Sequence, residues 1–265
     1  MIKKINQWVK NTEILVFGYN PKTQLFTYSR PFTVDEAESL ANETNRTINS
    51  QYKDAKGLTG GLQTIGTELI NISTLKGIIV NRVLMQRTQN QQWLPTIEEG
   101  IELQKQGMLP SKVRIDFGLV LYDEQFPDQE IAKSLMMTAT EKGYVTPVLA
   151  SFNSLDLDLG GKAYGVTPKI VSADGLIFGD EARMLLGENS FHKENSGVRR
   201  LGRSCSGGYW DADWDDDLGD FSVDCRVGRI STEGSAQKLE EEALIAFAPI
   251  RKSLDSILDP VGFFA

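Results

Sequence analysis

The chain has 265 residues, of which 28 are basic and 36 acidic, and its formal net charge at pH 7 is −8. This acidic excess argues against a general nucleic-acid-binding protein, because binding to a phosphate backbone normally requires a basic surface. Hydrophobic residues make up 40% and charged residues 24%, as in an ordinary globular protein long enough to bury one sizeable core. We therefore expect a single globular domain over residues 1–265.

The chain holds only two cysteines, Cys205 and Cys225, and one histidine, His192. Two cysteines without a secretory leader favour a cytoplasmic or intracellular location over a disulfide scaffold, and whether the two pair is left open. The single histidine argues against histidine-rich metal centres and histidine-based catalytic triads. No membrane span is predicted, because no window approaches about 20 apolar residues.

Taken in chain order, the first elements have clear local signals. Apolar residues at helical spacing predict a short helix at the N-terminus. Residues 13–19 and 24–29 then read as two strands around an Asn-Pro-Lys-Thr turn. Thr33 followed by Glu36 is a capping box, and it predicts a helix that continues to about residue 48.

The glycine-rich segment 57–66, GLTGGLQTIG, invites comparison with a phosphate-binding loop. It lacks the Gly-Lys-Ser/Thr ending of a P-loop and the spacing of a dinucleotide fingerprint, so it is interpreted as a tight connector. From residue 63 to 87 the pattern is rich in β-branched and apolar residues, and it predicts strands in LINIST and in GIIVNRVLMQRT.

A strand–helix–strand unit is predicted next, with strands at 113–122 and 145–149 around a helix at 128–142. If the two strands were parallel neighbours, their connection would be right-handed. In the following segment Asp156 and Asp158 alternate with three leucines. That pattern predicts a strand with the leucines buried, and a metal-chelating Asp-x-Asp is the alternative.

A short helix is predicted at 180–186, and a C-terminal helical tail over about 235–265, interrupted at Pro249. The tail ends with Phe263 and Phe264, which are expected to dock on the core or on a partner chain. Together these elements predict an α+β fold with a mixed, largely antiparallel sheet and three or four helices. The strand–helix–strand unit keeps an α/β fold as the alternative.

Charge is concentrated between residues 199 and 230, where seven aspartates alternate with aromatic residues. One interpretation is a β-hairpin whose strands include Trp210–Trp214 and Phe221–Val227, with the aromatic residues buried and the aspartates exposed. The other is a divalent-cation site, with these candidate ligands: Asp211, Asp213, Asp215 and Asp217. The EF-hand pattern fails here, because aspartate and serine replace its turn glycine and its bidentate glutamate. We therefore predict no tight calcium or magnesium site and expect no cofactor.

Three arginines precede the aspartates and are candidates for contact with a partner: Arg199, Arg200 and Arg203. Because no complete catalytic motif is found, the sequence favours a non-enzymatic structural or interaction protein. It would work within a larger assembly, with a protein partner or further copies of itself. Two alternatives remain open. One is an enzyme that uses a divalent cation on a phosphate or sugar substrate, and the other is a nucleic-acid-binding component of a complex.

Overall fold

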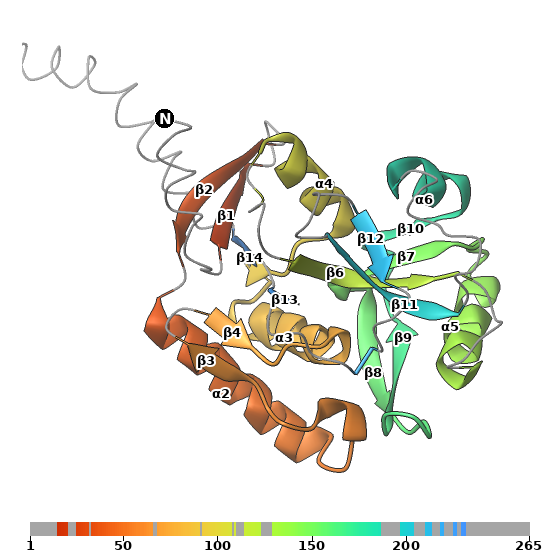
Figure 1. Ribbon diagram of the computed structural model, residues 1–265, viewed down its shortest axis with the longest axis horizontal. Helices are drawn as coiled ribbons and strands as arrows, with labels where there is room; N and C mark the ends of the chain where they lie inside the picture. The colour runs from red at the N-terminus through yellow and green to blue at the C-terminus, as the bar shows by residue number, and fades with distance from the viewer. Residues whose placement is uncertain are drawn as a thin grey trace, which may run out of the picture.

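The computed structural model describes residues 15–20, 25–31, 33–65, 68–90, 92–107, 109, 114–122, 129–186, 197–203, 210–213, 218–219, 225–226 and 229–231. Within this part of the chain, helices combine with mainly antiparallel strands (Figure 1). The predicted α+β class is therefore confirmed.

The helices of the described residues are α2 (Val34–Gln51), α3 (Thr74–Arg87), α4 (Ile97–Lys105), α5 (Gln129–Glu141) and α6 (Gly179–Leu186). Helix α2 begins at the predicted capping box: the Thr33 hydroxyl accepts from the Glu36 amide, and the Glu36 carboxylate accepts from the Thr33 amide. Helices α5 and α6 lie where the sequence predicts them. Helix α4 was not predicted, although Thr96 and Glu99 form a second capping box in front of it.

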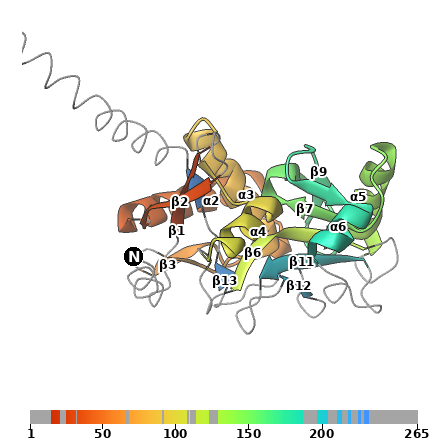
Figure 2. The same cartoon turned by 90° about the horizontal axis from the view of Figure 1, so that it is seen from above.

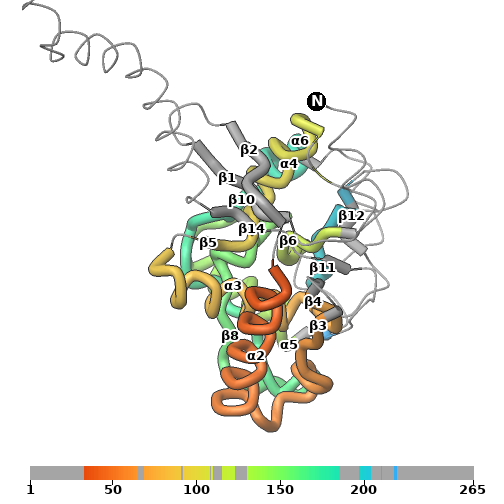
Figure 3. Tube along the Cα trace, turned by 90° about the vertical axis from the view of Figure 1, so that its left-hand side faces the viewer, coloured from red at the N-terminus to blue at the C-terminus, as the bar shows by residue number. Residues whose placement is uncertain are grey.

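The predicted strand in GIIVNRVLMQRT is wrong, because these residues form helix α3, which packs beside α2 (Figure 3). The Ser73 side chain caps the helix by accepting from the Lys76 amide. Ten of the fourteen residues of α3 are buried, polar Lys76 and Asn81 among them, so the polar residues do not mark one solvent-facing side that would reveal its period. A helix that is buried on most sides cannot be told from a buried strand by periodicity alone.

The main sheet has six strands in the order β10-β7-β6-β11-β12, with β13 paired to β6. Their bounds are β6 (Arg114–Leu121), β7 (Val148–Ser151), β10 (Leu176–Phe178), β11 (Val198–Arg203), β12 (Trp210–Asp213) and β13 (Cys225–Arg226). All neighbours are antiparallel except β13 and β6. The unit β6–α5–β7 is thus a strand–helix–strand unit between antiparallel neighbours, and the parallel crossover considered from the sequence does not form.

The predicted hairpin at the aspartate-rich segment is also wrong in its pairing. Strand β12 pairs with β11, and the described residues of the second predicted strand, β13, pair with β6. Alternation along a strand reports which face is buried but not which strand lies alongside, so the sequence could not decide this. Burial of Trp210 is confirmed, since its ring lies 4.8 Å from that of Phe117 and only 7% of the residue is exposed.

The remaining strands form three smaller sheets: β2-β1-β14-β5 (Leu25–Pro31, Leu15–Asn20, Arg229–Ser231, Gln92–Trp93), β3-β4 (Gln63–Ile65, Glu68–Ile70) and β8-β9 (Leu155–Leu159, Val166–Ile170). The antiparallel pair β1–β2 confirms the first two predicted strands. Strand β8 is confirmed as well, with Leu155 and Leu157 buried. The predicted burial of Leu159 is wrong, because it ends the strand and is 69% exposed.

Both faces of the main sheet are covered. Residues of α2, α3 and α5 pack with Val148 and Ala150 of β7, whereas residues of α4 and α6 pack with Leu149 of the same strand. Successive side chains of a strand point to opposite faces, so these are two separate layers of core. Helices α5 and α6 lie at the same end of the molecule as β7 (Figures 1 and 2).

Candidate functional site

The structure places part of the aspartate-rich segment in an edge strand. Asp211 and Asp213 belong to β12, while Asp215 and Asp217 lie outside the described residues. Among the residues described, no group of three or more histidine, cysteine, aspartate or glutamate side chains could hold a metal ion. Residues 214–217 lie outside the described residues, so the expectation of no tight cation site at 211–217 stays a prediction.

The three candidate arginines lie on β11, and they differ in their surroundings. Arg200 is completely buried, and its Nη2 donates to Oδ2 of Asp116 at 2.6 Å, with neither side chain exposed. Arg203 is also buried, and burial lowers the pKa of its guanidinium. Arg199 is half-buried and donates to the carbonyl of the preceding residue. Arg200 therefore belongs to the core and presents no side chain to a partner.

A sequence signal for this ion pair exists in β6, where Asp116 is the one acidic residue of RIDFGLVL. A carboxylate within an apolar strand needs a buried partner, because removing an unpaired charge from water costs several kcal/mol. The partner is an arginine from a strand 84 residues further along the chain, which local spacing cannot identify.

The two aspartates of the predicted Asp-x-Asp, Asp156 and Asp158, form ion pairs with basic residues of the same chain. Asp156 pairs with Arg82 of α3 at 2.9 Å, and Asp158 pairs with Lys169 of β9. The hydrogen bond to Asp158 raises the pKa of Lys169. Since each carboxylate already has its own cationic partner, the arrangement favours a structural role over metal chelation.

The remaining predicted interaction residues, Phe263 and Phe264, lie outside the described residues, as do both terminal helices predicted from the sequence. The same holds for His192 and Cys205. The role of the C-terminal tail therefore stays a prediction.

An exposed apolar cluster lies where β7 and β10 approach each other. The rings of Tyr144 and Phe178 lie 4.8 Å apart, and Phe178 is 38% exposed. Val145 is 64% exposed and lies beside Gly179, where an added Cβ would be 3.8 Å from the Cβ of Val145. We call Tyr144, Val145 and Phe178 the β10 surface. The strand expected at 145–149 included Val145, whereas β7 begins at Val148, so local sequence did not indicate this surface.

The β10 surface lies at an open edge of the main sheet. Strand β10 pairs only with β7 among the described strands, so its other side has no strand partner there. The helices at this end add two exposed methionines, Met137 on α5 and Met184 on α6 (Figures 1 and 2). Exposed apolar side chains scattered singly are normal, but apolar residues grouped at a sheet edge mark a surface for interaction.

A half-buried carboxylate connects α4 to the four-stranded sheet. Glu99 accepts from the Trp93 indole at 3.1 and 3.2 Å and from the Thr96 amide at 2.8 Å. Burial raises the pKa of Glu99, hydrogen bonds from Thr96 and Trp93 oppose the rise, and the nearby charge of Asp174 adds to it. These donors are neutral, so this carboxylate holds its position without a cation.

Comparison of the chain with protein-family models, with curated proteins and with solved structures finds no match. No helix within the described residues is long and apolar enough to cross a membrane.

Proposed function

We propose that this protein is a non-enzymatic structural or interaction protein that works within a larger protein assembly. The β10 surface is the observation that carries this proposal. It combines two aromatic rings and an exposed valine with the open edge of a strand. A partner that covers the surface removes apolar area from water, which stabilises a complex by about 25 cal/mol per Å² before the costs of association.

The partner that we propose for this surface is a second copy of the same chain. The net charge of −8 makes two copies repel one another, so a contact surface without charge favours association. The β10 surface is made of Tyr144, Val145 and Phe178, none of which is charged at neutral pH. Two identical edges can meet around a twofold axis, the commonest symmetry among soluble oligomers.

The experiment is size-exclusion chromatography with light scattering on the full chain and on Val145→Asp. At roughly 100 µM the wild type is expected to elute as an oligomer, which a micromolar dissociation constant guarantees. Val145→Asp is expected to be a monomer, because a charge placed on the contact has to be desolvated without a partner. Removing residues 260–265 tests the separate expectation that Phe263 and Phe264 strengthen association.

Val34→Asp is the matched control. Val34 is 43% exposed, but it lies at the start of α2, away from β10 (Figure 1). An aspartate in the first turn of a helix is favourable, so this variant is expected to fold and to associate as the wild type does. A monomeric wild type, or equal effects of the two substitutions, would contradict the proposal. Repeating the measurement with calcium and with EDTA tests the cation-dependent alternative.

A further inference from the structure

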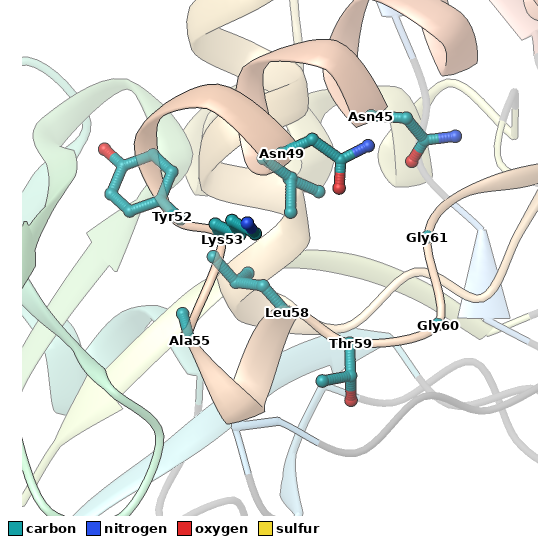
Figure 4. Close-up of a pocket in the computed structure, with 10 residues that line it drawn as sticks. Asn45, Asn49, Tyr52, Lys53, Ala55, Leu58, Thr59, Gly60 and Gly61 are labelled. Atoms are coloured by element: carbon teal, nitrogen blue, oxygen red, sulfur yellow. The ribbon is translucent and has the colours of Figure 1, made fainter.

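A small pocket of about 430 Å³ lies at the C-terminal end of α2, between that helix and the glycine-containing turn that follows it (Figure 4). Its deep part consists of the buried side chains of Ile48, Ala55 and Leu58 and of the ring of Tyr52. Small-molecule sites are typically concavities of about 300–1,000 Å³ with a mainly apolar lining and few polar groups. The pocket has this size, and its lining is divided between apolar side chains and polar groups.

Two walls of the pocket are held by hydrogen bonds. Asn45 clamps the turn to α2, because its Nδ2 donates to the Leu62 carbonyl at 2.8 Å and its Oδ1 accepts from the Leu62 amide at 2.7 Å. The Tyr52 hydroxyl donates to the Leu157 carbonyl at 3.2 Å and accepts from Arg82 at 2.9 Å. A pocket fixed in this way loses little conformational entropy when a ligand enters.

The glycines of the turn keep one side of the pocket open. Gly60 and Gly61 have φ angles of +78° and +48°, which other residues adopt only with strain. A Cβ at Gly60 would meet nothing within 4 Å, so the backbone there borders open space. These residues belong to the glycine-rich segment 57–66, which lacks the pattern of a phosphate-binding loop. The first part of the segment is a turn at the edge of the pocket, whereas Gln63–Ile65 form strand β3.

The exposed part of the pocket carries polar groups that have no partner among the described residues. Neither the Lys53 ammonium nor the Asn49 amide makes a hydrogen bond or ion pair with any residue that the structure describes. Among the described residues that line the pocket, Lys53 is the only charged one. Asn49 lies one helical turn after Asn45, on the same side of α2, so both amides face the glycine turn (Figure 4).

We propose that this pocket binds a small organic anion, a molecule with an apolar body and a phosphate or carboxylate group. The apolar body packs on Ile48, Ala55 and Leu58. The anionic group pairs with the Lys53 ammonium and accepts from the Asn49 amide, and hydrogen bonds of this kind are the strong ones in proteins. The site lies on a different part of the molecule from β10, and its ligand binding does not depend on the proposed assembly (Figure 1).

The test is calorimetric titration of the full chain with phenyl phosphate at low ionic strength. Saturable binding at one site per chain is expected. Lys53→Gln is expected to weaken it about tenfold or more, since hydrogen bonds to charged groups contribute at least that much. Lys56→Gln is the matched control, because this exposed lysine lies three residues further along and does not line the pocket. The affinity of the Lys56→Gln variant for phenyl phosphate is expected to stay within about twofold of the wild-type value. Melting temperatures verify that both variants fold.

Further probes separate the parts of the ligand. Inorganic phosphate lacks the apolar body and is expected to bind about tenfold more weakly than phenyl phosphate, because no ring is buried. Phenylacetate replaces the phosphate by a carboxylate, and whichever of the two aromatic anions binds more tightly identifies the anionic group. No saturable binding of either anion up to about 10 mM, an equal loss in the two lysine variants, or equal binding of benzylamine would overturn the proposal.

Discussion

The centre and the edge of the six-stranded sheet depart from the usual distribution of side chains in opposite ways. At the centre, β6 and β11 bury an ion pair, Asp116 with Arg200, with neither side chain exposed. At the edge, β10 and the residues beside it expose Val145 and Phe178, and the half-buried ring of Tyr144 lies against Phe178. The sheet therefore has a charged pair in its core and apolar side chains at its exposed edge.

The difference concerns where each group finds its partner. The buried charges satisfy one another within the chain, across two adjacent strands, so that region is complete by itself. In the described part of the chain, no other segment covers the apolar side chains of the β10 surface. Their removal from water would stabilise the protein only if another surface covered them. Substitutions at the centre should therefore affect folding, and substitutions at the edge should affect association.

The largest effect is expected from breaking the buried ion pair. Arg200→Met leaves the Asp116 carboxylate buried without its cation, which should lower the free energy of unfolding by about 3–5 kcal/mol. Urea denaturation followed by circular dichroism measures the loss. Replacing both partners by apolar residues, Asp116→Leu with Arg200→Met, should recover much of the stability, because no charge is then left unpaired. A single variant as stable as the wild type would refute the assignment of Arg200 to the core.

A smaller loss is expected from added volume in the core. A Cβ at Gly100 of α4 would lie 2.3 Å from Cε1 of Phe117, so Gly100→Ala must displace that ring. Overpacking of this kind costs about 1–3 kcal/mol, more than the roughly 1 kcal/mol that alanine gains over glycine in a helix. Val145→Leu adds volume at the exposed edge and should leave the midpoint of urea unfolding unchanged. Equal shifts for the two variants would remove the distinction between centre and edge.

Glu99 is a half-buried carboxylate, and its hydrogen-bond donors among the described residues are neutral groups. Its pKa in the folded protein is raised above the ordinary 4.5, so the folded state binds the proton more strongly than the unfolded state. Ionisation of Glu99 therefore costs stability at neutral pH, and the cost disappears as the pH falls below the folded pKa. The melting temperature of the wild type relative to Glu99→Gln should rise between neutral pH and 4.5. A relative fall over that range would show that the pKa is lowered instead.

The smallest effect on folding is expected at the β10 surface. Val145→Asp exchanges an exposed side chain for a charged one, and the monomer should keep its stability within about 0.5 kcal/mol. Thermal unfolding at low protein concentration, where association is absent, measures this. A loss of several kcal/mol would place Val145 in the core of the monomer and would contradict the distinction between centre and edge.

Much of the fold could be predicted because its signals are local. The capping box at Thr33, the helix that becomes α5 and the paired strands around residues 21–24 all depend on neighbours within a few residues. Helix α3 was mistaken for a strand because burial on every side removes the polar face that marks a helix. The pairing of β12 with β11 was missed because strand partners are chosen by tertiary contacts.

The candidate sites were harder to predict, because they combine residues from separate elements. The three arginines of β11 look alike in sequence, yet Arg200 is in the core while Arg199 is only half-buried. The β10 surface depends on a ring contact between Tyr144 and Phe178, 34 positions apart, and on the strand order that leaves β10 at the edge. Neither the burial of a charge nor the position of a strand in a sheet is visible in local spacing.

Hydrogen–deuterium exchange as a function of protein concentration tests the central claim most directly. If a second copy covers the β10 surface, the amides of Leu176–Phe178 should exchange more slowly at roughly 100 µM than at about 1 µM, because only the concentrated sample is associated. The amides of α2 should exchange at the same rate in both samples, and Val145→Asp should abolish the change at β10. Exchange at β10 that does not depend on concentration in the wild type, or protection that survives in Val145→Asp, would contradict association through this surface.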